Sequence, residues 1–527
     1  MKKEHAEGGG CDRLPVWLWA IMGVFFLKTF FLAFWLIPLW DIQDEPGHYS
    51  YISDIANGKG LPVMGKAYFD EGVREHWLKG TWKDHYSLNW IVQHPPFYYA
   101  INSLILSAAT IVTADPESLF RITRFLSVIS GTLALFVFYQ FFFLVSRDRK
   151  FSLFSVAAIS FIPMFGNQSS GTTHDALLTL LCGLSVLYWA KFVETGKMKY
   201  SLLMASFLSL SAFTKSTSLL LFLPMIGVCF FYIKEDIFYK RLFKFGIIAF
   251  IAILLPGIWM LRSYMQYGVM LSTWHNVMQH FAEADLLKTS LHQYLTNTPI
   301  IDNLYTSFFG EFGWTGKGGL CRVLLLKNSA QFMPLYHVLG LLFVLLSYLF
   351  YVRKDMAICN RKVTKSMLIS WVVISYFLFY GLPVKFHFYS PVILYAVMLV
   401  MFVFSFQTIP LLAVEWKKFM PVSKQYMIVN EDVLVENKFV YLSMIVSFVY
   451  TNIFIVELNK FYEMFHMVRA DHGRYWFPVI PLLAICYVFP AFKVISFHKV
   501  FLLLILIAMC FNEILIYYFY VAPFYSS

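Results

Sequence analysis

"VWLWAIMGVFFLKTFFLAFWLIPL", residues 16–39, is an apolar run with one charged residue, Lys28. About 20 apolar residues are enough to cross the hydrocarbon core of a bilayer. The run is also too long for the apolar part of a cleaved signal peptide. It therefore predicts a membrane-spanning helix. The polar stretch "WDIQDEPGHYSYISDIANG" at 40–58 follows directly, and Pro46 favours the first turn of a second helix there.

The composition is that of a membrane protein. Of 527 residues, 59% are hydrophobic and 14% are charged, whereas soluble proteins carry about 25% charged residues. The net charge of +11 does not indicate nucleic-acid binding, because Lys and Arg cluster between apolar runs, as in cytoplasmic loops. The seven cysteines show no paired or metal-binding spacing. We therefore expect an all-α polytopic membrane protein.

The apolar runs predict a topology of about thirteen membrane helices. The stretch 199–233 is too long for one crossing, so we expect two short helices that meet near Lys215. The apolar run 91–112 has two prolines, Pro95 and Pro96, near its start. Four basic clusters share the cytoplasmic side only if 91–112 lies at, or re-enters, the outer surface; they are 146–150, 234–244, 352–365 and 415–419. The remaining expected spans are 16–39, 121–145, 151–168, 174–193, 243–262, 333–352, 364–382, 388–408, 439–457, 474–492 and 497–520.

This topology places most polar motifs on the extracytoplasmic side of the membrane. We expect the chain to consist of two modules. The first, 1–233, contains the acidic outer loop 40–120 with a helix lying along the membrane. The second, 234–527, contains the outer loop 263–332. We expect no separate soluble domain. Long loops on one face are typical of an enzyme that works there, and a channel does not need them.

Two acidic motifs and one lysine are candidates for chemistry. A carboxylate at an apolar surface is poorly hydrated, so Asp44 or Glu45 is suited to take a proton from a hydroxyl. The same pair also suits the start of a helix. Asp175, in "GTTHDALL", is explained equally well as a helix cap. Lys215 lies between two apolar helices, where ionisable groups are usually functional.

The cations near the predicted outer helix ends are candidates for phosphate binding. Arginine binds phosphate through two parallel hydrogen bonds, or it extends its charge to the membrane interface. We favour the interfacial role for Arg262 and phosphate binding for Arg474 in "DHGRYWFP". His94, in "HPPFYYA", stands before a predicted helix and by itself indicates only a helix start.

The order of these motifs resembles that of the GT-C glycosyltransferases. These multipass enzymes take a sugar from a polyprenyl-phosphate carrier on the extracytoplasmic side. The resemblance is closest to bacterial relatives of the protein O-mannosyltransferases and of the lipid A aminoarabinose transferase. It rests on the outer Asp-Glu pair followed by "HPPFYY", "RITRFLSVISGTLALFVFY", "THDALL", "FTKSTSLLLFLP", "WMLRSYMQYG", "FFGEFGW" and "HGRYWFPVIPLL".

The resemblance implies a role for each matching residue. Asp44 is the base or acceptor-orienting carboxylate, with Glu45 beside it. Asp175 matches a carboxylate that holds a divalent metal ion in some relatives. His94 replaces a lysine that faces the lipid phosphate, and this departure weakens the role because histidine is a conditional cation. Arg474 matches an arginine that contacts the phosphate. Beside these residues, Lys215 and Arg262 are further candidates for the phosphate, and Asp41, His48, Glu311 and Trp314 are candidate acceptor or lid residues.

The expected function is an inverting hexosyl- or pentosyltransferase of a bacterial inner membrane. Its donor would be a polyprenyl-phosphate sugar, and its acceptor an extracytoplasmic glycan, lipid or protein. No Walker-type glycine loop occurs, which argues against direct nucleotide use. The alternative is a transporter or flippase, which also places ionisable groups at helix ends. The chain shows no clear internal repeat of the kind that transporters often have.

Overall fold

The computed structural model describes three long parts of the chain and several shorter ones. These are residues 14–75, 88–235 and 237–271, the strands at 311–312 and 321–322, most positions of 438–454, and residues 473–489, 492 and 499–523. The predicted spans 333–352, 364–382 and 388–408 lie outside the described residues, as does Trp314. For Glu311 only the backbone is described.

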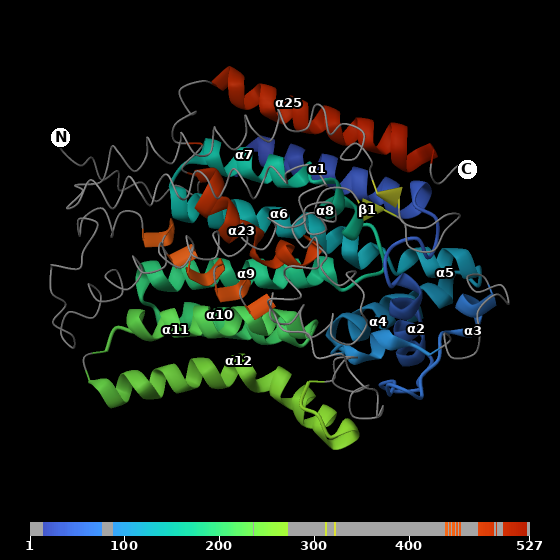
Figure 1. Cartoon of the computed structure of the whole chain (residues 1–527), viewed down its shortest axis with the longest axis horizontal. Coiled ribbons are helices and arrows are strands. Elements are labelled where there is room, and N and C mark those ends of the chain that lie inside the picture. Colours follow the sequence, from blue (N-terminus) through green and yellow to red (C-terminus); the bar gives the residue numbers. More distant parts are fainter. Residues whose placement is uncertain are drawn as a thin grey trace, which may run out of the picture.

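The described residues are almost entirely helical, in layers of roughly parallel helices (Figure 1). The layers run from α25 at the top of the view to α12 at the bottom, and α2 to α5 gather at one end. The elements are α1 (Val16–Phe31), η1 (Leu32–Leu36), α2 (Glu45–Ala56), α3 (Glu71–Val73), η4 (Trp90–Gln93), α4 (Phe97–Val112), α5 (Pro116–Ile122), α6 (Phe125–Ser146), α7 (Arg149–Ser160), α8 (Pro163–Gln168), α9 (Asp175–Thr195), α10 (Met198–Ala212), η5 (Ser216–Leu221), α11 (Phe222–Tyr232), α12 (Phe238–Tyr267), β1 (Glu311–Phe312), β2 (Cys321–Arg322), η9 (Gly473–Val479), α23 (Ile480–Leu483), η10 (Ala484–Val488), α25 (Lys499–Ile516) and η11 (Tyr517–Val521).

Four helical stretches in the described part are long and apolar enough to cross a membrane. They are Val16–Leu36, Pro116–Ser146, Asp175–Thr195 and Phe238–Tyr267. Helix α9 is mostly buried at the centre, whereas α1 and α12 expose large apolar side chains such as Trp17 and Leu261. Apolar residues on the outer surface suit contact with lipid. The predicted helical membrane fold is confirmed, although the helix count also depends on spans outside the described residues.

The helix break near Lys215 is confirmed. Helix α10 ends at Ala212, Lys215 has an extended backbone (φ −154°, ψ 126°), and η5 and α11 follow. The single span predicted at 151–168 is wrong, because α7 ends at Ser160 and α8 starts at Pro163. Proline has no amide hydrogen to continue a helix but is well suited to a first turn.

Helix α4 begins at Phe97, after the proline pair, and has 16 residues. At about 1.5 Å per residue, its length is roughly 24 Å, less than the ~30 Å of a hydrocarbon core. It lies beside α2 at the end of the bundle (Figure 1). Its place beside α2 fits a helix that stays at the membrane surface, whereas its length does not decide, because α10 is shorter, with 15 residues. Whether it crosses remains a prediction.

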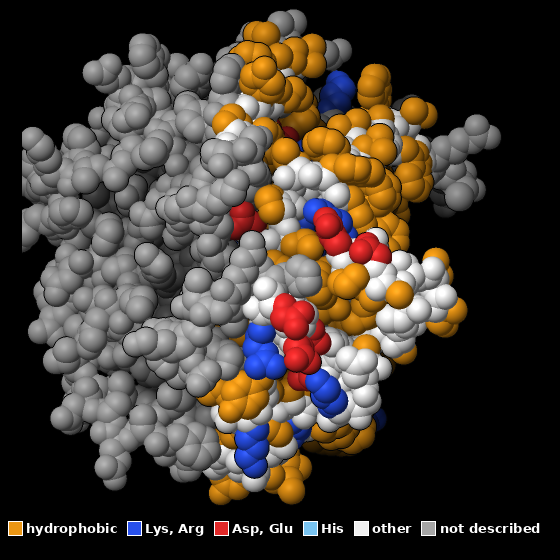
Figure 2. Space-filling view, turned by 90° about the vertical axis from the view of Figure 1, so that its right-hand side faces the viewer, with side chains coloured by type: hydrophobic (Ala, Val, Ile, Leu, Met, Phe, Trp, Pro, Cys, Tyr) orange, Lys and Arg blue, Asp and Glu red, His pale blue; other side chains and the backbone are white. Residues whose placement is uncertain are grey.

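Two of the basic clusters lie together at the opposite end. Arg147, after α6, forms an ion pair with Glu194 in α9. Lys234, before α12, donates a hydrogen bond to the Thr195 carbonyl at 2.8 Å. The clusters at 146–150 and 234–244 therefore share one face, as the charge rule predicts. Figure 2 views the other end, where acidic and basic side chains gather within an apolar surface.

The charge of Lys28, inside α1, is balanced by the last described helix. Its Nζ donates to Glu513 Oε1 of α25 at 2.7 Å and to the Ser160 carbonyl at 2.6 Å. Both side chains are largely buried. An unpaired ammonium group at such a depth is costly, so this pair fixes α25 against α1 and α7.

We expect Gly131→Ala to destabilise the protein. A Cβ at this α6 position would lie 2.7 Å from the Cβ of Ser169, the residue that follows α8, which is too close for α6 to keep its packing there. Overpacking of this kind costs about 1–3 kcal/mol. Gly23→Ala in α1 is the matched control, because a Cβ there meets no atom within 4 Å. The check is thermal unfolding in detergent, and equal melting temperatures for the two variants would contradict the expectation.

Candidate active site

Asp44 caps α2 with a strained backbone. Its φ of 63° and ψ of 5° lie in the left-handed region, which a non-glycine residue adopts only when its surroundings hold it there. Its carbonyl accepts the amides of Gly47 and His48, which begins the helix. Its carboxylate accepts the indole N–H of Trp90 at 3.1 Å, and Arg474 Nη2 lies 3.4 Å from Oδ2. The side chain is 20% exposed, so it can be reached from outside.

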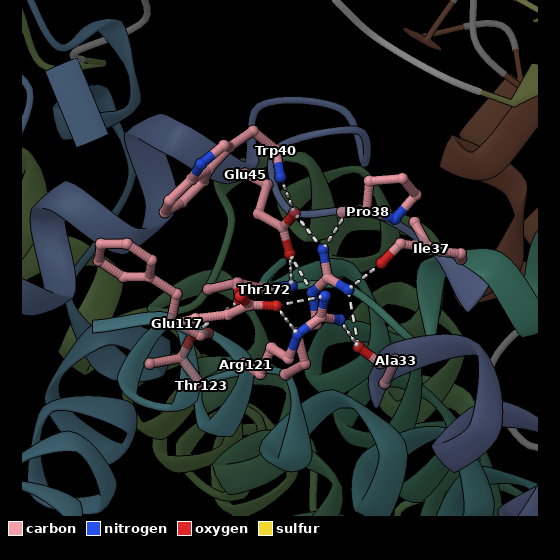
Figure 3. Close-up of polar contacts among 11 residues, drawn as sticks. Ala33, Ile37, Pro38, Trp40, Glu45, Glu117, Arg121, Thr123 and Thr172 are labelled. Carbon is pink, nitrogen blue, oxygen red and sulfur yellow. Dashed lines mark hydrogen bonds and ion pairs between the residues drawn. The ribbon is translucent and has the colours of Figure 1, made fainter. Parts of the chain in front are cut away.

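Glu45 has a different environment, in which every acceptor position is used (Figure 3). Arg124 binds both of its oxygens at 2.7 Å. The amides of Trp40 and Thr172 donate to them at 2.9 and 3.0 Å. A carboxylate offers about four acceptor sites, and the Glu45 side chain is only 2% exposed. Glu45 is therefore not placed to receive a proton from a substrate.

Arg124 fixes the loop that carries Asp44. Besides Glu45, its guanidinium donates to the carbonyls of Ala33, Ile37 and Pro38 at 2.7–2.8 Å (Figure 3). All five N–H donors of this fully buried side chain are thus used. The sequence analysis missed this residue, although it stands in the "RITRFL" motif. A single arginine at a helix start suggests interfacial anchoring, and only the fold brings it to Glu45.

Four charged residues from distant segments meet beside the loop. Lys215 Nζ lies 2.7 Å from Asp175 Oδ1, and Arg474 Nε lies 3.7 Å from Asp175 Oδ2. Arg474 also reaches Asp44. The charges alternate in the order Asp44, Arg474, Asp175 and Lys215, and they sum to zero. Such pairing is what makes buried charges tolerable in an apolar bundle. An added phosphate would find two cations here.

Three histidines lie next to these charges, and two of them, His48 and His174, are buried. The ring centroid of His174 is 4.7 Å from that of His48 and 4.5 Å from that of His94. Burial lowers the pKa of His48 well below its usual value and that of His94 to about 3, and neighbouring cations add to the effect at His94. Both imidazoles are therefore neutral at pH 7. His94 can offer a hydrogen bond to a phosphate, but not the positive charge of the lysine it replaces.

The structure places the other candidates away from these charges or leaves their side chains undescribed. Arg262 donates to the Pro62 carbonyl at 3.2 Å and stacks over Trp259. It thereby ties the loop after α2 to α12, and we leave it out of the proposed phosphate site. Asp41 is buried at the start of the Asp44 loop. Glu311 lies in the short strand β1, with only its backbone described.

The described residues do not form a metal site. No group of three or more His, Cys, Asp or Glu side chains among them is arranged to hold an ion. The Asp175 carboxylate, the expected ligand, already faces Lys215 and Arg474. A metal ion there would have to displace one of these cations. We therefore derive no step through a metal.

A family comparison covers the segment that carries much of this site. Residues 93–259 match the model of the dolichyl-phosphate-mannose-protein mannosyltransferase family. The match covers less than half of the chain. It includes His94, Arg124, Asp175 and Lys215, whereas Asp44 and Arg474 lie outside it. Among curated proteins, none matches the chain significantly.

Solved structures that are similar to this chain include an oligosaccharyltransferase and ArnT. One is the Archaeoglobus fulgidus oligosaccharyltransferase in complex with Zn and sulfate (TM-score 0.42, 12% identity, 96% of this chain and 53% of that one). Another is ArnT from Cupriavidus metallidurans bound to undecaprenyl phosphate (TM-score 0.36, 13% identity, 90% and 77%). The chain thus spans about half the length of the first of these.

Proposed function

We propose that this protein moves a sugar from a polyprenyl-phosphate carrier to an extracytoplasmic acceptor. The observation that carries the proposal is the contact between Asp44, a reachable carboxylate, and Arg474, a cation suited to phosphate. A carboxylate and a phosphate-binding cation side by side are what transfer from a lipid phosphate to a hydroxyl needs. The match of residues 93–259 to the dolichyl-phosphate-mannose-protein mannosyltransferase family supports the same reaction class.

In the proposed reaction, the acceptor hydroxyl oxygen forms a bond to the anomeric carbon of the sugar. The bond from that carbon to the phosphate oxygen breaks, and its electron pair leaves with the lipid phosphate. The hydroxyl proton passes to Asp44. Arg474 and Lys215 stabilise the charge that grows on the phosphate. Attack from the face opposite the phosphate inverts the anomeric configuration.

The orientation in the membrane belongs to the same proposal. The charged site lies at the end of the bundle that carries α2 and α4 (Figure 1), opposite the clusters at 146–150 and 234–244. If those clusters face the cytoplasm, the site faces outward in a bacterial cytoplasmic membrane. A lipid-linked donor suits this side, because its sugar can be loaded inside and presented outside.

The test is to incubate the purified protein with undecaprenyl-phosphate sugars that carry a radiolabelled hexose or pentose. We expect label to move to an added acceptor or, slowly, to water. A divalent metal ion and a chelator are tested in parallel, since some relatives hold an ion near the matching Asp175. Movement of intact donor across vesicle membranes, without cleavage of any donor, would instead establish a transporter.

We expect Arg474→Ala to weaken binding of undecaprenyl phosphate about tenfold or more, because a charge-assisted hydrogen bond contributes roughly 1.5–3 kcal/mol. Arg474→Lys should lose less, since it keeps the charge without the planar fork. Arg262→Ala is the control arginine and should bind normally. Intact lipid binding by Arg474→Ala would leave Arg474 as a structural partner of Asp44 and Asp175.

A further inference from the structure

A tyrosine hydroxyl joins the buried histidines His48 and His174. Tyr99 Oη lies 2.9 Å from His48 Nδ1 and 3.3 Å from His174 Nδ1. All three side chains are almost completely buried. A hydroxyl has one hydrogen to donate, so it donates to one imidazole and accepts from the other. Each choice fixes which nitrogen carries the hydrogen on both rings.

The far side of His174 decides between the two choices. Its Nε2 lies 3.4 Å from Asp175 Oδ1, and it has no hydrogen-bond partner among the described residues. A lone pair on Nε2 would face a carboxylate oxygen in a site with little water, which is repulsive. An N–H there is attracted to the same oxygen. The second arrangement leaves Nδ1 of His174 as the acceptor of the Tyr99 hydroxyl.

We propose that His48, Tyr99 and His174 form a directed hydrogen-bond chain that ends beside Asp175. His48 Nδ1–H donates to Tyr99 Oη, and Tyr99 O–H donates to His174 Nδ1. The hydrogen on His174 Nε2 is attracted to Asp175 Oδ1, which lies 3.4 Å from that nitrogen, without a hydrogen bond between them. His174 is then a positioning residue for the Asp175 carboxylate. Its role in transfer rests on the proposed function, whereas the direction of the chain does not.

The position of the Asp175 carboxylate matters because this carboxylate orients the Arg474 guanidinium. With Oδ1 held by Lys215 and His174, Oδ2 faces Arg474 Nε at 3.7 Å. The same guanidinium then presents Nη2 to Asp44. The hydrogen-bond chain therefore runs from His48 in α2, through Tyr99 in α4, to His174 beside the first residue of α9. In this way it connects the helix that follows Asp44 with the start of α9. Partners at this distance commonly fix the orientation of groups that contact a ligand.

Activity measurements test the positioning role. Tyr99→Phe removes the bridging hydroxyl, and we expect kcat to fall about ten- to hundredfold with a smaller change in KM for the donor. Tyr51→Phe is the matched control, since its ring stacks on Tyr99 with centroids 3.9 Å apart. Within the described part of the chain, its hydroxyl donates to the His94 carbonyl at 3.4 Å and not to a histidine ring. Equal kcat values for the two variants would overturn the role.

Two substitutions of His174 distinguish the role of its Nδ1 from that of its Nε2. A glutamine side chain places its amide nitrogen near the position of Nε2, whereas asparagine places it near Nδ1. We therefore expect His174→Gln to keep most of the transfer rate and His174→Asn to lose it, at similar melting temperatures. The reverse order would mean that the hydrogen on Nδ1 is the important one.

Nitrogen NMR of protein labelled with ¹⁵N-histidine reads the chain without any assay of transfer. The expected spectrum has the hydrogen on Nε2 in His174 and on Nδ1 in His48, with His174→Gln and His48→Asn assigning the signals. Tyr99→Phe should mix the two forms. A hydrogen on Nδ1 of His174, alone or on both nitrogens, would overturn the proposed direction. If no lipid-linked sugar reacted, the proposed function would be wrong. The spectra would still show whether the hydrogen-bond chain has the proposed direction.

Discussion

Asp44→Asn should lower the rate of sugar transfer by about 10²–10⁴-fold, the usual contribution of a positioned base. Asparagine keeps the size of the side chain and tolerates the left-handed backbone at this position. It can still accept the Trp90 indole N–H, and only the charge and the basicity are lost. The protein should therefore fold normally and bind undecaprenyl phosphate.

The matched control is Asp54→Asn, on the same helix. Asp54 pairs with the exposed Lys59, and such a pair has little influence on a reaction elsewhere. Rates are compared under single turnover, so that binding and chemistry are read separately. A fully active Asp44→Asn enzyme would rule out this carboxylate as the base, and with it the proposed mechanism.

Arg124→Met should cost about 3–5 kcal/mol of stability, because it leaves Glu45 buried and unpaired. The carbonyls of Ile37 and Pro38 also lose the Arg124 donors, and that of Ala33 keeps only the longer contact from Arg121 among these arginines. We expect little folded protein in the membrane and a much lower melting temperature. Glu45→Gln should behave similarly but less severely, since glutamine can still accept part of the network.

Arg121→Met is the control, three residues earlier on the neighbouring helix. Arg121 pairs with Glu117, whose side chain is 61% exposed (Figure 3), and exposed pairs contribute roughly 0–1 kcal/mol. If Arg124→Met were as stable as Arg121→Met, the network would not fix the loop. If Glu45→Gln folded normally but lost transfer as Asp44→Asn does, Glu45 would be the base.

Local signals in the sequence predicted the elements that place the site. Pro46 and the acidic pair marked the start of α2, and Lys215 marked the break between two short helices. Both depend on neighbouring residues, so one sequence is enough to see them. Pro163 carried the same kind of signal for the end of α7, and the apolar length of 151–168 wrongly outweighed it.

Contacts between distant segments could not be predicted in this way. Glu45 and Arg124 are 79 positions apart, and nothing near either residue indicates a partner. Judged from the residues alone, Asp44 and Glu45 are equally suited to accept a proton. The fold distinguishes them, because it gives the two carboxylates different surroundings. No role was predicted for His174, which stands next to Asp175 in "GTTHDALL". Its place beside Tyr99 depends on how α4 packs near the start of α9.

The ion pair between Lys28 and Glu513 has a consequence for how the protein is made. Its two members are 485 positions apart, so α1 enters the membrane long before its partner has been synthesised. During that interval the ammonium group of Lys28 must extend to the membrane interface or be hydrated by water that enters the bilayer. Either one makes insertion of α1 less favourable. A chain that stopped before α25 would keep this uncompensated charge. The pair can therefore form only after α25 has been synthesised and packed against α1.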